Sequence, residues 1–228
     1  MHKLIPTEDG SVTLYVPALN EHYHSVHGAI QESQHIFIQA GLFHFLDTHP
    51  EFVTTEYPLH ILEAGFGTGL NAYLTLLQAT EKKIHIHYHS IEKYPLNGTE
   101  FEILNYPDQL AGADRQLFLE LHRCSWEVPH SITPYFTLHK QQGDFREINF
   151  DNQFHIVYFG AFNPDVQPHL WTESVFQRFN KAMRKDSILV TYCVKGIVKQ
   201  ALRTNGFTLK RLPGPPGKRE MLRACKSE

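Results

Sequence analysis

The chain has 228 residues, of which 42% are hydrophobic and 20% charged, and its net charge is −3. This composition is that of a globular protein with a sizeable core; no apolar run approaches the ~20 residues of a membrane span, and the N-terminus lacks the apolar core of a signal peptide. Three scattered cysteines without a CxxC pair exclude a disulfide framework or a cysteine zinc site, so we expect reduced thiols in a cytoplasmic protein.

Residues 1–50 are expected to form an N-terminal extension, a hairpin followed by a helix, that packs on the main domain. The turn signal Thr7–Gly10 separates two short strand-like runs. Apolar residues at helical spacing then predict a helix over His27–Leu46.

Residues 51–228 alternate between strand and helix patterns, which predicts one α/β domain. In chain order the predicted elements are strand His60–Leu62, helix Leu70–Glu81, strand Ile84–Ile91, a mostly helical stretch Leu96–His130, strands Phe136–Lys140 and Phe154–Phe159, helix Thr172–Met183, strand Ile188–Cys193, helix Lys195–Asn205 and strands Phe207–Leu212 and Met221–Ala224. Such alternation implies a parallel sheet covered on both faces. The last two runs flank a Pro-Gly turn, so the fold class is a Rossmann-like, mostly parallel sheet with a C-terminal antiparallel hairpin.

The segment Glu63–Gly69 reads Glu-Ala-Gly-Phe-Gly-Thr-Gly between a predicted strand and a predicted helix. Its glycines allow a sharp turn and a close approach of the backbone to a ligand. The acid-x-G-x-G-x-G spacing differs from the G-x-G-x-x-G loop that binds a pyrophosphate. A carboxylate suits S-adenosylmethionine (SAM), which carries an ammonium and a sulfonium cation and no phosphate. The loop therefore predicts a SAM site; a glycine turn that serves packing alone is the alternative. The cofactor contacts expected here are Glu63, Gly65, Gly67, Thr68 and Gly69.

Two further acids follow the next strands. Glu92 ends the second predicted strand and is expected to accept the ribose hydroxyls, or else to pair at the surface with Lys93, its neighbour. Asp144 follows the strand Phe136–Lys140 and is expected to reach the adenine amine, unless it serves only to form the turn.

The end of the fourth core strand, Tyr158–Pro164, lies beside the topological switch point, where ligands sit in open α/β sheets. Groups that handle the substrate of a methyl transfer belong at this place. The candidate catalytic positions are Gly160, Phe162 and Asn163.

Several stretches together resemble a known family. They are Asn20–Ser25, Gly28–Ser33, Glu63–Asn71, Ser90–Leu96, Asn163–Pro168, Leu170–Thr172, Gly206–Phe207 and Gly217–Leu222. In these stretches the chain resembles the methyltransferases of bacterial tRNA wobble-uridine modification, the MnmC-type 5-methylaminomethyl-2-thiouridine methyltransferases. The resemblance implies the class I SAM-dependent methyltransferase fold and methyl transfer to the exocyclic amine of 5-aminomethyl(-2-thio)uridine in tRNA.

The same resemblance implies further site residues and a partner. Glu32, Asn71 and Lys93 match positions near the cofactor, and Tyr23 matches one near the substrate. Many family members are fused to a flavin-dependent oxidoreductase, for which this length leaves no room. We therefore expect a stand-alone form that works with a separate oxidoreductase of the same pathway.

Gly160 departs from the family pattern, which carries Asp at this position. A carboxylate there would orient the amine and take its proton, and Gly160 can do neither. The Asn163 carbonyl is a candidate substitute, and Phe162 is expected either to stack on the target base or to pack in the core. Two alternatives to an active tRNA methyltransferase follow: a SAM- and tRNA-binding homologue with impaired catalysis, and a small-molecule methyltransferase.

Positive charge is concentrated near the C-terminus. Residues 181–224 include eleven basic and two acidic residues, a net charge of +9 within a chain of −3. This favours contact with tRNA phosphates, in particular from Lys218 and Arg219, although ordinary solvated faces are an alternative. The alternating His85, His87 and His89 lack accompanying acids or cysteines, and we expect no metal site.

Overall fold

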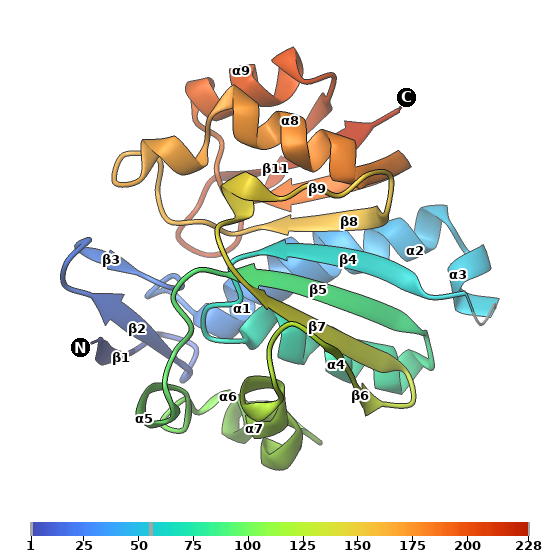
Figure 1. Ribbon diagram of the computed structural model, residues 1–228. Helices are drawn as coiled ribbons and strands as arrows, with labels where there is room; N and C mark the ends of the chain where they lie inside the picture. Colours follow the sequence, from blue (N-terminus) through green and yellow to red (C-terminus); the bar gives the residue numbers. More distant parts are fainter. Residues whose placement is uncertain (1, 55–56, 228) are drawn as a thin grey trace.

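The computed structural model describes residues 2–54 and 57–227, so the outer limits of the expected segments, residues 1 and 228, lie outside the described residues. Its centre is an eight-stranded sheet with the order β10-β11-β9-β8-β4-β5-β7-β6 (Figure 1). The strands are β4 Leu59–Ala64, β5 Ile86–Glu92, β6 Pro129–Thr133, β7 Phe136–Gln142, β8 Phe154–Phe159, β9 Met183–Thr191, β10 Thr208–Pro213 and β11 Glu220–Lys226.

The five central strands are parallel, and both edges carry antiparallel pairs. β4 lies between β5 and β8, so the chain switches direction across the sheet at this point. At one edge β11 runs antiparallel between β9 and β10. This confirms the predicted mostly parallel sheet with a closing C-terminal hairpin, and a ligand site is expected at the switch between β4 and β8.

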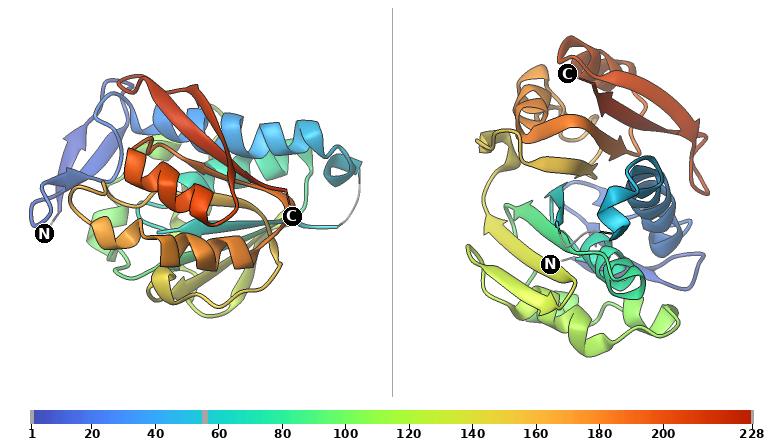
Figure 2. Two further views of the ribbon diagram at one scale, coloured as in Figure 1. Left: turned by 90° about the horizontal axis from the view of Figure 1, so that it is seen from above. Right: turned by 90° about the vertical axis from the view of Figure 1, so that its right-hand side faces the viewer.

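Helices cover both faces of the sheet, as Figure 2 shows. Successive side chains of β4 point to opposite faces, so that Ile61 belongs to one apolar cluster and Leu62 to the other. The first face is covered by α1 Ala29–Ser33, the π-helix η1 Gln34–Phe43, α2 His44–Thr48, α4 Leu70–Lys82 and α7 Arg115–Arg123, and the second by α8 Glu173–Ala182 and α9 Gly196–Thr204. The short helix α3 spans Glu51–Thr54.

The first long helix is confirmed, but it contains a π-helical stretch that helical periodicity does not predict. α1, η1 and α2 follow one another without a break, and the His44 amide donates to the carbonyl of Gln39, five residues earlier. Gly41 lies where a Cβ would come within 3.2 Å of Val190 Cγ2 and 3.3 Å of the Tyr158 ring. The glycine therefore lets this helix lie directly against β8 and β9.

The N-terminal hairpin is confirmed, with a short third strand. β1 Lys3–Pro6 and β2 Val12–Val16 are antiparallel, and β3 Glu21–His22 pairs with β2. Leu14 of this small sheet is 1% exposed and belongs to the apolar cluster of the main sheet. A division into two segments at residue 50 remains a prediction.

The expectation of a mostly helical segment from Leu96 to His130 is wrong in part. Only short helices form there, α5 Gly98–Phe101, α6 Tyr106–Gln109 and α7. Pro129 and His130 begin the edge strand β6, which pairs antiparallel with β7. Proline weakens a strand prediction but is tolerated on an edge strand, where its missing N–H faces solvent.

Candidate cofactor and active site

A cavity of about 450 Å³ opens at the carboxyl ends of β4, β5 and β8. Its size lies within the range of about 300–1,000 Å³ that is usual for small-molecule sites. Predicted site residues that line it are Tyr23, Gly65, Gly67, Glu92, Lys93, Asp144, Gly160 and Phe162. Side chains from four separate parts of the sequence thus meet at the switch point.

The glycine loop has the backbone conformation that its sequence predicts. Gly65, Gly67 and Gly69 have φ values of +91°, +51° and +71°, a region that favours glycine. A Cβ on Gly67 would come within 3.0 Å of the Tyr23 ring, and one on Gly69 within 2.7 Å of His122 Nε2. The loop passes so close to its neighbours that side chains at these two positions do not fit.

Two histidines that sequence reasoning missed hold Thr68, which is only 1% exposed. His24 Nε2 lies 2.6 Å from the Thr68 hydroxyl, and His122 Nε2 lies 3.1 Å from its carbonyl oxygen. Because a carbonyl only accepts, His122 Nε2 must carry the hydrogen. Burial lowers the pKa of His122 to about 3. Thr68 therefore shapes the loop from below and does not line the cavity. His24 falls in a stretch that carries the family resemblance, whereas no local pattern marks His122.

Glu63 lies beneath the glycine loop with 2% of its surface exposed, outside the cavity lining. The Ser90 hydroxyl donates to Glu63 Oε2 at 2.8 Å. Burial raises the pKa of Glu63 to about 8, although the hydrogen bond from Ser90 acts in the opposite direction. Asn71, in the first turn of α4, is 9% exposed and also lies outside the lining. The predicted contacts of both residues with the cofactor remain predictions.

Glu92 lines the cavity at the end of β5, as predicted. The Gly67 amide donates to its Oε2 at 2.9 Å, and the Tyr94 amide donates to its Oε1 at 2.7 Å. Each carboxylate oxygen can accept more than one hydrogen bond. The carboxylate is thus fixed between the two loops with acceptor capacity left for hydroxyl groups in the cavity.

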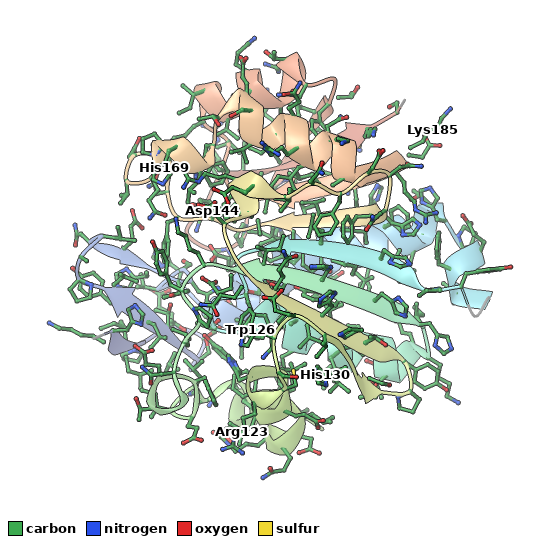
Figure 3. The ribbon with its side chains drawn as sticks, in the orientation of Figure 1. Arg123, Trp126, His130, Asp144, His169 and Lys185 are labelled. Carbon is green, nitrogen blue, oxygen red and sulfur yellow. The ribbon has the colours of Figure 1, made fainter. Side chains whose placement is uncertain are left out.

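Asp144 and Lys93 line the cavity together with Arg146 (Figure 3 labels Asp144). Lys93 Nζ lies 3.0 Å from Asp144 Oδ2, and the Arg146 guanidinium bonds both oxygens of the same carboxylate. These hydrogen bonds, chiefly those from Arg146, hold the pKa of Asp144 well below its usual range. Asp144 also accepts the Arg146 amide at the start of a 3₁₀ turn, η2 Phe145–Glu147. Asp144 therefore has the turn-forming role, and its contact with the adenine amine remains a prediction.

The three candidate catalytic positions have different surroundings. Gly160 lines the cavity just after β8, and a Cβ on it would lie 3.3 Å from Phe37 Cζ. The half-buried Phe162 ring meets the Tyr23 ring edge to face at 5.1 Å, and both line the cavity. Asn163 lies outside the lining, and its Oδ1 accepts the Asp165 amide at 3.0 Å. Asn163 thus stabilises a turn, and its catalytic role has no contact to support it.

Glu32 and Lys218, 186 positions apart, form an ion pair outside the cavity lining. Glu32 is 8% exposed and also accepts the Ser25 amide at 3.1 Å. Lys218 Nζ lies 5.3 Å from the centre of the Tyr192 ring. Arg219, by contrast, is exposed. The pair joins the N-terminal segment to the C-terminal hairpin, so Lys218 has a partner within the protein whereas Arg219 faces solvent.

Several residues that the sequence analysis did not identify also line the cavity. His2, Val16 and Leu19 come from the N-terminal sheet, and Gln167 and His169 from the loop after β8. Periodicity carries no signal for the first three, since contacts between distant segments place them. The last two fall in or beside stretches that resemble the family.

The described residues contain no group of three His, Cys, Asp or Glu side chains arranged to hold a metal ion. His87 packs against His60 at 5.0 Å between ring centres, and His89 against His139 at 4.3 Å. Within residues 2–54 and 57–227, no helix is long and apolar enough to cross a membrane.

Comparisons with known proteins agree with this site. A family model described as S-adenosyl-L-methionine-dependent methyltransferase matches residues 135–227. The tRNA 5-methylaminomethyl-2-thiouridine biosynthesis bifunctional protein MnmC of Burkholderia mallei is 30% identical over 240 residues, which cover 96% of this chain and 34% of the relative. The chain therefore spans about a third of the length of the curated relatives it matches.

Solved structures give the same result. The crystal structure of MnmC2 from Aquifex aeolicus superposes with a TM-score of 0.79 at 26% identity, covering 98% of this chain and 70% of that one. A spermidine synthase from Thermotoga maritima, at a TM-score of 0.50 and 16% identity over 95% of this chain and 69% of that one, shares the fold. The sheet, the glycine loop and these matches define a class I SAM-dependent methyltransferase, with SAM as cofactor. Within that class, these matches support an MnmC-type methyltransferase domain.

Proposed function

We propose that the protein transfers the methyl group of SAM to the exocyclic amine of 5-aminomethyl(-2-thio)uridine at the tRNA wobble position. The observation that carries the proposal is the cavity at the switch point, where the cofactor loop faces the aromatic pair Tyr23 and Phe162. The names of the relatives, which concern 5-methylaminomethyl-2-thiouridine in tRNA, support the choice of substrate. A tRNA substrate would place the protein in the cytoplasm.

The residues present fit the cofactor. The Gly65–Gly67 backbone leaves room for a ligand beside the loop, and the Glu92 carboxylate can accept the ribose hydroxyls. Asp144 lines the same cavity and would accept the adenine amine in exchange for one of its bonds from Lys93 or Arg146. The buried carboxyl of Glu63 lies under the loop, where an ammonium group would favour its ionised form. Bound SAM supplies an activated methyl group, whose carbon is attacked by the neutral amine.

The substrate side of the cavity is aromatic. Tyr23 and Phe162 present two rings at 70° to each other, and burial raises the pKa of Tyr23, so its hydroxyl stays protonated. Aromatic side chains commonly stack on unpaired bases of single-stranded RNA. A wobble base turned out of its loop can therefore lie against Phe162 with its aminomethyl group directed at the cofactor.

Gly160 favours a second candidate, a homologue that binds SAM and tRNA with weak catalysis. No side chain at this cavity-lining position can orient the amine. A Cβ here would press on Phe37 Cζ at 3.3 Å, so Gly160→Asp requires the ring to shift by a few tenths of an ångström. The fold should survive this change, because the atom that must move is the far end of the Phe37 side chain and not backbone.

The test is methyl incorporation from labelled SAM into tRNA isolated from a strain that lacks the modification. The proposed function predicts incorporation that depends on tRNA, with the methylated nucleoside identified after digestion. Incorporation into the free nucleoside at an equal rate would indicate a small-molecule methyltransferase instead. If the wild type is slow and Gly160→Asp raises the rate by about 10²-fold or more, the second candidate is correct.

We further propose two partners. Phosphates of the tRNA would lie against the basic C-terminal segment, where Arg219 is exposed. A flavin-dependent oxidoreductase activity of the same pathway would supply the substrate amine, and the description of the relatives as bifunctional is consistent with a second activity.

A further inference from the structure

The proposed reaction needs an acceptor for one proton. An alkyl amine is protonated near neutral pH and in that form has no lone pair, so it must lose one proton before its nitrogen attacks the methyl carbon. Gly160 lines the cavity and, having no side chain, offers no acceptor. Asp165, a few residues further on, does not line the cavity and forms an ion pair with Lys195. The proton must therefore go to another group in the cavity or to water.

The carboxylates of the cavity already have partners. Glu92 accepts two backbone amides, one on each oxygen. Asp144 is held by Arg146 and Lys93, and these cations keep its pKa well below the usual range. A carboxylate that resists protonation is a poor proton acceptor. Asp144 is therefore unsuited to take the amine hydrogen, and the remaining acceptor capacity of Glu92 is assigned to the ribose hydroxyls in the proposed function.

The other ionisable groups of the lining are also unsuited, with one exception. Lys93 and Arg146 are cations paired with Asp144. Tyr23 keeps its proton because burial raises its pKa, and Tyr94 is a second phenol. His2 comes from the opposite, N-terminal wall, and its buried Nδ1 lies 2.8 Å from a carboxylate oxygen of Glu100, so this nitrogen is not open to the substrate.

His169 is the exception. It lines the cavity, its side chain is exposed, and within the described residues it makes no hydrogen bond, ion pair or ring contact (Figure 3 labels it). We propose that the imidazole of His169 accepts the proton of the substrate amine, in place of the missing carboxylate at Gly160. This inference rests on the proposed function.

The loop that carries His169 is anchored at several points, so its backbone has a defined place beside the cavity. The buried Trp171 donates its Nε1–H to the Phe162 carbonyl at 2.8 Å. The Tyr192 hydroxyl donates to the Ala161 carbonyl at 2.8 Å. His169 sits in the 3₁₀ turn η3 Pro168–Leu170 between these anchors. The loop therefore holds the imidazole on the same cavity as Phe162 and Gly160.

The step balances without any further reactant. The amine lone pair forms the new N–C bond, the C–S bond breaks, and its electron pair stays on sulfur, leaving neutral S-adenosylhomocysteine. One N–H proton passes to the free ring nitrogen of neutral His169. Because His169 is exposed, it returns this proton to solvent before the next turnover. A positioned base of this kind typically contributes about 10²–10⁴-fold to the rate.

The experiment compares the whole chain with His169→Gln in methyl transfer to 5-aminomethyl-2-thiouridine tRNA. We expect kcat to fall about 10²-fold, with KM for tRNA and Kd for SAM unchanged, because glutamine keeps polarity but takes no proton. His87→Gln is the matched control, since His87 is exposed on β5 at the other end of the sheet. Added imidazole should restore part of the rate of His169→Ala. Gly160→Asp in the His169→Gln background should also restore it.

The outcomes separate the two hypotheses. A wild type that methylates this tRNA as fast as His169→Gln does would overturn the role of His169 and leave the proposed function standing. Loss of SAM affinity or a raised KM, without rescue by imidazole, would show a structural role and overturn the inference as well. A wild type without any tRNA methylation would remove the proposed function and, with it, the inference.

Discussion

Replacing Glu63 by Gln should change how the stability of the protein depends on pH. The carboxyl group is 2% exposed, and burial raises its pKa from the ordinary 4.5 to about 8. Between these two values the unfolded chain is ionised while the folded protein keeps the proton. The folded state then binds one more proton than the unfolded state, so the free energy of unfolding falls as pH rises. Below pH 4.5 and above pH 8 this contribution is constant.

The size of the effect follows from the two pKa values. A rise from 4.5 to about 8 corresponds to about 5 kcal/mol lost by the wild type across this range. Total stabilities of about 5–15 kcal/mol make such a change measurable. Glu63→Gln keeps an acceptor for the Ser90 hydroxyl and cannot ionise. The variant should therefore equal or trail the wild type near pH 5 and exceed it at pH 9.

Urea unfolding at several pH values measures this difference. Histidines that burial keeps neutral, such as His24 and His122, titrate in both proteins and cancel in the comparison. SAM should also bind the wild type more tightly as pH rises through 8, because its cations favour the ionised carboxylate, whereas Glu63→Gln should lose this dependence. Parallel stability curves for the two proteins from pH 5 to 9 would refute the reasoning.

Four further substitutions test the cofactor site and the basic C-terminal segment. Glu92→Ala should weaken SAM binding by about 1–3 kcal/mol, measured by calorimetry, because the Gly67 amide and the ribose hydroxyls lose their acceptor; an unchanged affinity would exclude the ribose contact. Gly67→Val should abolish SAM binding, since a Cβ at this position would lie 3.0 Å from the Tyr23 ring. Binding at wild-type strength would disprove the loop assignment. Arg219→Ala should weaken tRNA binding and flatten its salt dependence in filter binding. Lys218→Ala should weaken tRNA binding too and should also reduce thermal stability, because it leaves the buried Glu32 unpaired. If Arg219→Ala and Lys218→Ala both bind tRNA like the wild type, the basic segment is a solvated face and not a tRNA contact.

The sequence predicts the parts of the fold that depend on local pattern. The strands β4, β5 and β8 and the glycine loop have unambiguous periods and turn residues, and all lie where they are expected. The π-helical stretch around Gly41 depends instead on how close the helix approaches Tyr158 and Val190. β6 forms because β7 has an edge with which it can pair, and no short stretch of the sequence reveals that edge.

The site shows the same division. Gly67 and Glu92 are placed by the loop and by a strand end, and both reach the cavity as expected. Glu63 obeys the sequence pattern, yet the fold turns its carboxylate inward to Ser90. The ion pair of Glu32 with Lys218 joins residues 186 positions apart, and residue spacing cannot predict such a partner.

The N-terminal segment is part of the site and not an accessory to it. Tyr23 lies against both the glycine loop, at Gly67, and the substrate side, at Phe162. Two ion pairs fix this segment to distant parts of the chain, His2 with Glu100 and Glu32 with Lys218. A SAM-binding sheet alone would leave the cavity open on this side, and water would compete with the amine for the space beside the methyl group. Because the same segment touches the glycine loop and the proposed substrate wall, it is the element best placed to make the proposed methyl transfer depend on a correctly seated base.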